Sequence, residues 1–135
     1  MLQALLKRGA NYRAKNSRYE EPLHCAAQSG HVECAKLLLS RGSDIAVKTK
    51  SGQGVLHKAA IGGYGPMISF LVERGAKVDA VDIDGNTALH RAAWKNKSLS
   101  IRALVTNKAV VDAPNKHGKT PFHWAAEEGH LEVMT

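Results

Sequence analysis

A repeat of fixed length constrains this chain more than any other feature of its sequence. Four segments carry the pattern His-x-Ala-Ala, and their histidines lie 33 residues apart, at His24, His57, His90 and His123. No insertion or deletion breaks the period in any copy. A drift-free period of this length indicates an array in which each unit buries its apolar faces against its neighbours.

Each unit is predicted to contain two short helices and a projecting turn. Thr120 followed by Pro121 suits a helix start, because the hydroxyl caps the helix and proline is tolerated at the first helical position. Leucines at 37–39 supply the apolar stripe of a second helix, and pairs such as Asp84-Gly85 supply the turn of a hairpin-like finger. The unit that starts at Gly54 lacks both threonine and proline, so we expect it to be the weakest complete unit.

These units resemble the ankyrin repeat, whose period and T-P-L-H-x-A signature they match. The resemblance covers the whole chain. It implies an all-α fold, an ankyrin-type solenoid of helix-turn-helix repeats with β-hairpin fingers and a concave surface for partners. In this register residues 1–135 form a single ankyrin repeat domain. It contains complete repeats at 21–53, 54–86 and 87–119, and partial repeats at 1–20 and 120–135.

Apolar side chains stand at both ends of this register, where an array ordinarily carries polar capping repeats. Leu5 and Leu6 precede the first complete unit, and Val133 and Met134 follow the last. We therefore expect the chain to be a piece of a longer array. Its ends should fray or associate end to end.

Composition narrows the setting and the class of partner. No apolar run approaches the roughly 20 residues that cross a bilayer, so no membrane insertion is expected. Two cysteines, Cys25 and Cys34, are typical of a cytoplasmic or nuclear protein with free thiols. The net charge of +7 favours acidic partners.

The repeat histidines do not suggest a metal site. Stacked helices lie about 8–10 Å apart, whereas the ligands of one zinc ion each lie about 2 Å from it. Histidines on successive repeats therefore cannot converge on one ion. The resemblance implies instead that each histidine is structural and holds the loop before its helix by hydrogen bonds.

We find no catalytic motif and expect neither an enzyme nor a cofactor. Cys25 follows His24 directly, and adjacent residues of a helix point about 100° apart, so they form no dyad. The glycine-rich segment 62–66 lacks the preceding strand and the Lys-Ser/Thr ending of a phosphate-binding loop. It is predicted to be a turn between helices, made loose by its extra glycines.

The resemblance implies that a partner contacts the finger tips and the exposed side and end of each first helix. On the fingers these positions are Arg18, Lys50, Ser51, Ile83, Asp84, Lys116, His117 and Lys119. On or beside the first helices they are Gln28, Lys58, Arg91, Trp94, Lys95 and Trp124.

Trp94 is the most informative of these residues. It occupies a position where a small or polar residue would suffice, and basic residues flank it. Exposed tryptophan beside arginine and lysine is typical of a binding hot spot. The competing interpretation is that the indole folds back over the finger and only packs.

The leading functional interpretation is a protein-protein interaction module, an adaptor or scaffold segment whose partner presents acidic and apolar groups. The alternative is nucleotide or nucleic-acid binding on a basic concave face around Trp94, with the indole stacking on a base. An aromatic content of 5% and acidic finger tips near Asp82 and Asp84 disfavour this alternative. A structural spacer, with no preferred patch, is a third interpretation.

Overall fold

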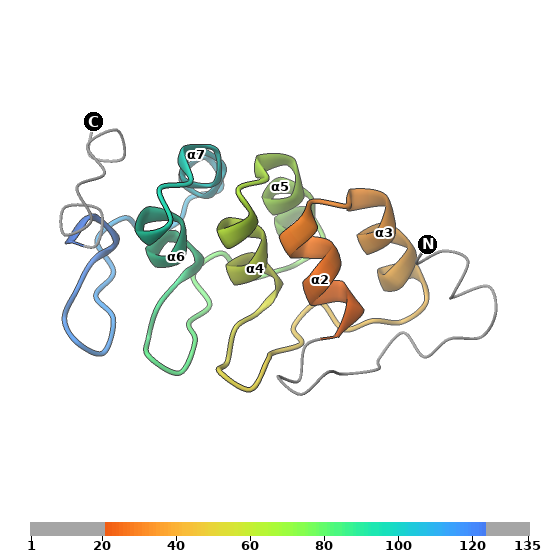
Figure 1. Ribbon diagram of the computed structural model, residues 1–135, viewed down its shortest axis with the longest axis horizontal. Helices are drawn as coiled ribbons and strands as arrows, with labels where there is room; N and C mark the ends of the chain where they lie inside the picture. Colours follow the sequence, from red (N-terminus) through yellow and green to blue (C-terminus); the bar gives the residue numbers. More distant parts are fainter. Residues whose placement is uncertain (1–20, 124–135) are drawn as a thin grey trace.

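The computed structural model describes residues 21–123, and within that range it contains helices and turns but no strand (Figure 1). The helices are α2 (Pro22–Ser29), α3 (Val32–Ser40), α4 (Val55–Gly62), α5 (Gly65–Glu73), α6 (Ala88–Trp94) and α7 (Ser98–Thr106). An inner row is formed by α2, α4 and α6, and an outer row by α3, α5 and α7. This arrangement confirms the predicted all-α solenoid of helix-turn-helix repeats.

Several predictions concern residues beyond this range. The partial repeat at 1–20, the site residues Arg18 and Trp124, and the apolar ends all lie outside the described residues. Within residues 21–123, no helix is both long and apolar enough to cross a membrane.

The inner helices start in different ways. The hydroxyl of Thr87 accepts a hydrogen bond from the backbone N–H of His90 (3.3 Å) and so caps α6. Proline at position 22 begins α2, as the rule for the first helical position predicts. Gly54 precedes α4 and offers no side-chain cap. The start of α4 therefore has the least local support of the three.

Small side chains line the contact between successive inner helices. Each repeat contributes a buried pair of alanines, and these are Ala26, Ala27, Ala59, Ala60, Ala92 and Ala93. Buried leucines at matching positions in the outer row, Leu38 and Leu104 among them, fill the space between the two rows. Because the alanines add little bulk, neighbouring inner helices approach each other closely.

At Gly62, the last residue of α4, the approach leaves no room for a side chain. A Cβ atom on Gly62 would overlap the carbonyl oxygen of Gln28 and lie 3.0 Å from its carbonyl carbon. On the other side, a Cβ on Gly65 would lie 3.4 Å from the carbonyl oxygen of Leu99. The predicted turn at 62–66 is shorter than expected, because Gly62 still belongs to α4 and Gly65 already belongs to α5, which leaves residues 63 and 64 between the helices. Gly62 and Gly65 serve close contacts with the two neighbouring repeats, a need that the expectation of a loose turn overlooked.

Within residues 21–123, three fingers project from one side of both rows: the first precedes α4, the second precedes α6 and the third follows α7, with its tip at residues 115–119 (Figure 1). Among the described residues their tips are turns closed by backbone hydrogen bonds, without a strand ladder. In the first finger, the backbone N–H of Thr49 donates to the carbonyl of Gln53 (2.9 Å) and closes the turn. Successive tips are also joined, because the N–H of Ile83 donates to the carbonyl of Ser51 (3.1 Å).

Candidate partner-binding surface

The repeat histidines hold the start of each inner helix. A backbone N–H three residues earlier donates to Nδ1 of each ring. The pairs are Glu21 with His24 (3.0 Å), Gly54 with His57 (3.1 Å), Thr87 with His90 (3.0 Å) and Thr120 with His123 (2.9 Å). These bonds confirm the predicted structural role. In residues 21–123 no three His, Cys, Asp or Glu side chains are grouped so that they could hold a metal ion.

The opposite ring nitrogen fastens an inner helix to the next finger. Because Nδ1 accepts, the neutral ring carries its proton on Nε2. From there His57 donates to the carbonyl of Asn86 (2.7 Å), and His90 donates to the carbonyl of Lys119 (2.8 Å). Burial lowers the pKa of both histidines below the usual 6.5. Both rings are therefore neutral at pH 7, which is the form that these hydrogen bonds require.

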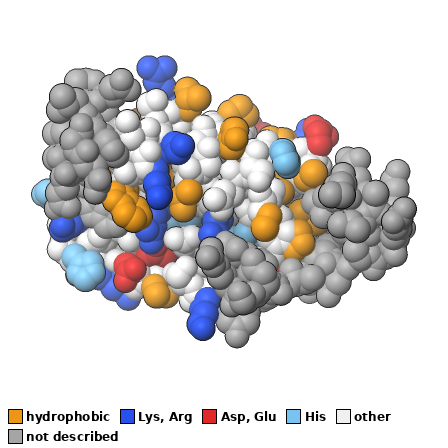
Figure 2. Space-filling view, in the orientation of Figure 1, with side chains coloured by type: hydrophobic (Ala, Val, Ile, Leu, Met, Phe, Trp, Pro, Cys, Tyr) orange, Lys and Arg blue, Asp and Glu red, His pale blue; other side chains and the backbone are white. Residues whose placement is uncertain are grey.

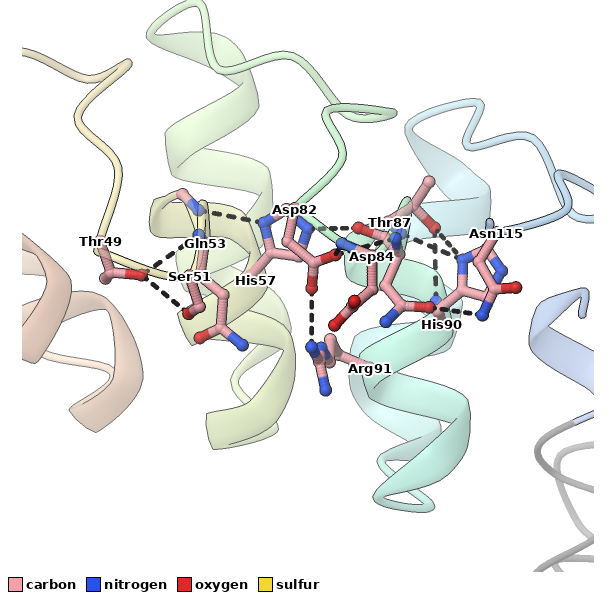
Figure 3. Close-up of polar contacts among 12 residues, drawn as sticks. Thr49, Ser51, Gln53, His57, Asp82, Asp84, Thr87, His90, Arg91 and Asn115 are labelled. Carbon is pink, nitrogen blue, oxygen red and sulfur yellow. Dashed lines mark hydrogen bonds and ion pairs between the residues drawn. The ribbon is translucent and has the colours of Figure 1, made fainter. Parts of the chain in front are cut away.

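One polar side chain organises each finger, three residues before the tip glycine (Figure 3). In the second finger, a carboxylate oxygen of Asp82 accepts from the N–H groups of Asp84 (2.9 Å) and Asn86 (3.0 Å). Asn115 does the same in the third finger, and the hydroxyl of Thr49 accepts from the Gln53 N–H (3.2 Å) in the first. These side chains set the shape of the tips from the inside.

Asp82 also ties its finger to the next inner helix. Its other carboxylate oxygen accepts from a terminal nitrogen of Arg91 at 2.7 Å, and the Asp82 side chain is fully buried (Figure 3). Burial by itself would raise the pKa of Asp82, but the hydrogen bonds from Arg91 and from the N–H groups of Asn86 and Asp84 outweigh it and hold that pKa below 3.8. The pair therefore stays ionised at neutral pH.

This pairing changes the interpretation of two predicted features. Arg91 is a predicted partner-binding residue, yet its charge is neutralised by Asp82, and its side chain on α6 is only 14% exposed. Asp82 is likewise no acidic surface group, because its residue is 5% exposed. Of the two acidic residues at this tip, only Asp84 faces solvent.

The predicted finger-tip residues form an exposed row. Lys50, Ser51, Ile83, Asp84, Lys116 and His117 are all exposed, and Lys119 is half-buried. Ile83 is the apolar member, with 55% of its surface accessible. The N–H of Lys116 donates to the carbonyl of Asp84 (3.0 Å), so the second and third tips keep a fixed spacing.

Trp94 and Lys95 lie at the far end of α6. Trp94 is 38% exposed, and the Lys95 ammonium lies 4.9 Å from the centre of its ring. The guanidinium of Arg91 lies 5.9 Å from the same ring. Both distances are within the range of a cation–π interaction, which orients the indole without burying it.

The predicted residues thus fall at two edges of the inner row. α6 has seven residues, and a helix of that length spans about 10 Å. The finger tips lie beyond its start, and Trp94 and Lys95 lie at its end. Half-buried Lys58 on α4 lies between the two edges, and exposed Gln28 lies near the end of α2. Figure 2 shows lysine and arginine side chains gathered in a column over α6.

A cavity of about 230 Å³ lies elsewhere, between the loops 45–48 and 75–80 and beside the first turn of α4. Its walls are mostly apolar, and none of the predicted site residues lines it. Sequence reasoning missed this cavity, because its walls come from two loops that only the fold brings together.

The family model described as ankyrin repeats (3 copies) matches residues 1–82, 36–114 and 56–135. These overlapping matches span the whole chain, and the first alone covers more than half of it. A search of the curated proteins finds no match. Ankyrin repeats are generally protein-protein interaction modules and are typically non-enzymatic. With its period, its paired helices and this match in agreement, the chain belongs to the ankyrin repeat family.

Proposed function

We propose that this chain is a protein-binding adaptor or scaffold segment. Its partner lies across the inner helices and the finger tips, and Trp94 is the anchor. The observation that carries this proposal is the exposed indole at the end of α6, held by two cations on a face that the stacking of repeats leaves open. Two free thiols suit work in the cytoplasm or nucleus, where cysteines stay reduced.

The chemistry of the surface indicates the partner. Lysines at the first and third tips, together with Lys95, favour carboxylates, whereas Ile83 and Trp94 favour apolar side chains. Exposed ion pairs contribute only about 0–1 kcal/mol each, so the charges set orientation and association rate. The desolvated indole supplies most of the affinity, as aromatic anchors do in other interfaces.

Nucleic-acid binding has less support from this geometry. Arg91 is already paired with Asp82, and Asp84 is exposed between the lysines of the first and third tips. A continuous track of free cations along the fingers, which a phosphate backbone requires, is therefore interrupted.

Selection of peptides from a random 16-residue display library tests the proposal. Enriched peptides are synthesised and added to isotopically labelled protein, and the backbone amide shifts of residues 21–123 are followed by NMR. We expect enrichment in acidic and apolar residues, with shifts confined to the inner helices, Trp94 and the finger tips.

Shifts confined to the outer helices α5 and α7 would contradict the proposed face. A selection that yields no peptide above background, while a single-stranded oligonucleotide binds with strong salt dependence, would replace protein binding by nucleic-acid binding.

A further inference from the structure

The turns between inner and outer helices form an edge opposite the fingers (Figure 1). At this edge one side chain of each turn lies across a glycine of the repeat before it. The Tyr64 ring covers Gly30, because a Cβ on that glycine would lie 2.6 Å from Cγ of the ring. Lys97 covers Gly63 in the same way, with its Cδ 3.1 Å from such a Cβ. The side chains of successive turns are therefore contiguous.

These contacts bring basic, aromatic and apolar groups together. Tyr64 is 47% exposed, and Lys97 lies over the glycine next to it in the chain. Lys95 is exposed in the same turn as Lys97, and Leu99 follows in the first turn of α7 with 61% exposure. Together Tyr64, Lys95, Lys97 and Leu99 form what we call the turn-edge patch.

The patch has no acidic counterpart among the described residues. Segments 61–66 and 94–99 contain no aspartate or glutamate, and no ion pair of Lys95 or Lys97 is found within residues 21–123. In the preceding repeat, Glu33 in the first turn of α3 is paired with Lys36 (3.4 Å). As far as residues 21–123 determine it, the charge at this edge is therefore positive.

We propose that the turn-edge patch is a second docking surface, which receives an acidic segment of a protein partner with an apolar side chain beside its carboxylates. Carboxylates pair with Lys95 and Lys97, and the apolar side chain packs between Tyr64 and Leu99. A base-stacking ligand fits less well, because one face of the Tyr64 ring is occupied by Gly30. This inference rests on the proposed protein-binding function. The turn-edge patch adjoins the Trp94 site, because Lys95 belongs to both.

The probe is a fluorescein-labelled peptide of twelve residues made of glutamate and leucine. A peptide with lysine in place of each glutamate is the control. Anisotropy measures binding to the whole chain, and NMR locates it. We expect amide shifts at 62–66 and 95–99, and about a tenfold weaker binding for Lys97→Glu. The matched control is Lys77→Glu, which makes the same charge change at an exposed lysine in the loop after α5 and should alter binding less than twofold.

Tyr64 is tested by two variants, because its ring also packs on Gly30. Tyr64→Phe removes only the hydroxyl and should keep the fold, while Tyr64→Leu removes the aromatic ring and should weaken binding severalfold. Equal losses for Lys97→Glu and Lys77→Glu would overturn the proposal, and so would amide shifts away from this edge. Tighter binding of an oligonucleotide at the patch would assign it to nucleic acid. If peptides selected from the display library still need Trp94 while the patch variants have no effect, the second surface is wrong and the proposed function stands.

Discussion

Replacing Gly62 with alanine tests the close packing that holds the inner row together. Gly62 ends α4 with a negative φ, so the backbone itself accepts alanine, and helix propensity alone would favour alanine by up to about 1 kcal/mol. Against this, the new Cβ would overlap the carbonyl oxygen of Gln28. That oxygen belongs to the backbone of α2, so no side-chain rotation relieves the contact, and the two helices must separate.

Overpacking of this kind costs about 1–3 kcal/mol. Because the overlap is with backbone, the upper part of this range applies, about 2–3 kcal/mol. After the gain of about 1 kcal/mol in propensity, we expect Gly62→Ala to lower the free energy of unfolding by about 1–2 kcal/mol, and Tm by roughly 4–10 °C. Gly54→Ala is the matched control, because the nearest atom to its Cβ is 3.9 Å away. Urea and thermal unfolding followed by circular dichroism compare the two variants. Equal stability of Gly62→Ala and Gly54→Ala would refute the packing argument.

Three further changes test the remaining structural claims. Gly54→Thr should add about 1 kcal/mol to the free energy of unfolding, because it gives α4 the cap that Thr87 gives α6. Amide hydrogen exchange in α4 should then slow, and unchanged exchange counts against this explanation. Lys108 has a φ of +68°, so Lys108→Gly should stabilise by about 1 kcal/mol, and a destabilised variant would show that the strain is absent. The pKa values of His57 and His90 are lowered from 6.5 in the folded protein, so the unfolded chain binds protons more readily. The free energy of unfolding should therefore be highest above about pH 6.5 and should fall as the pH drops below it. Urea midpoints that stay constant between about pH 7.5 and 5.5 would contradict this.

The fold could be predicted from sequence because its rules are local and repeated. The fixed spacing of His57 and His90, the alanine pairs and the tip glycines each determine a helix start, a flat contact or a turn, and four copies remove the ambiguity of one. The structural role assigned to the histidines is confirmed for the same reason.

The surface was less accessible to sequence reasoning, because its properties depend on pairs that are distant in the chain. Arg91 and Asp82 are each charged, and only the fold shows that they neutralise each other. Tyr64 and Lys97 belong to different repeats, so no motif connects them, and the glycines beneath them resemble ordinary turn residues. One missed feature could have been found from the sequence. A polar residue recurs three positions before each tip glycine, as Thr49, Asp82 and Asn115, with the same period of 33 residues.

The most direct test of the proposed function is the effect of Trp94→Ala on affinity for the library-selected peptides, measured together with its thermal unfolding. Val110→Ala, at an exposed apolar position in the loop after α7, is the control. Our account predicts that Trp94→Ala loses about 2 kcal/mol of binding free energy, roughly 30-fold in Kd, with Tm unchanged, while Val110→Ala binds normally. Unchanged affinity with a sharply lowered Tm would show that Trp94 is a packing residue and that the partner binds elsewhere.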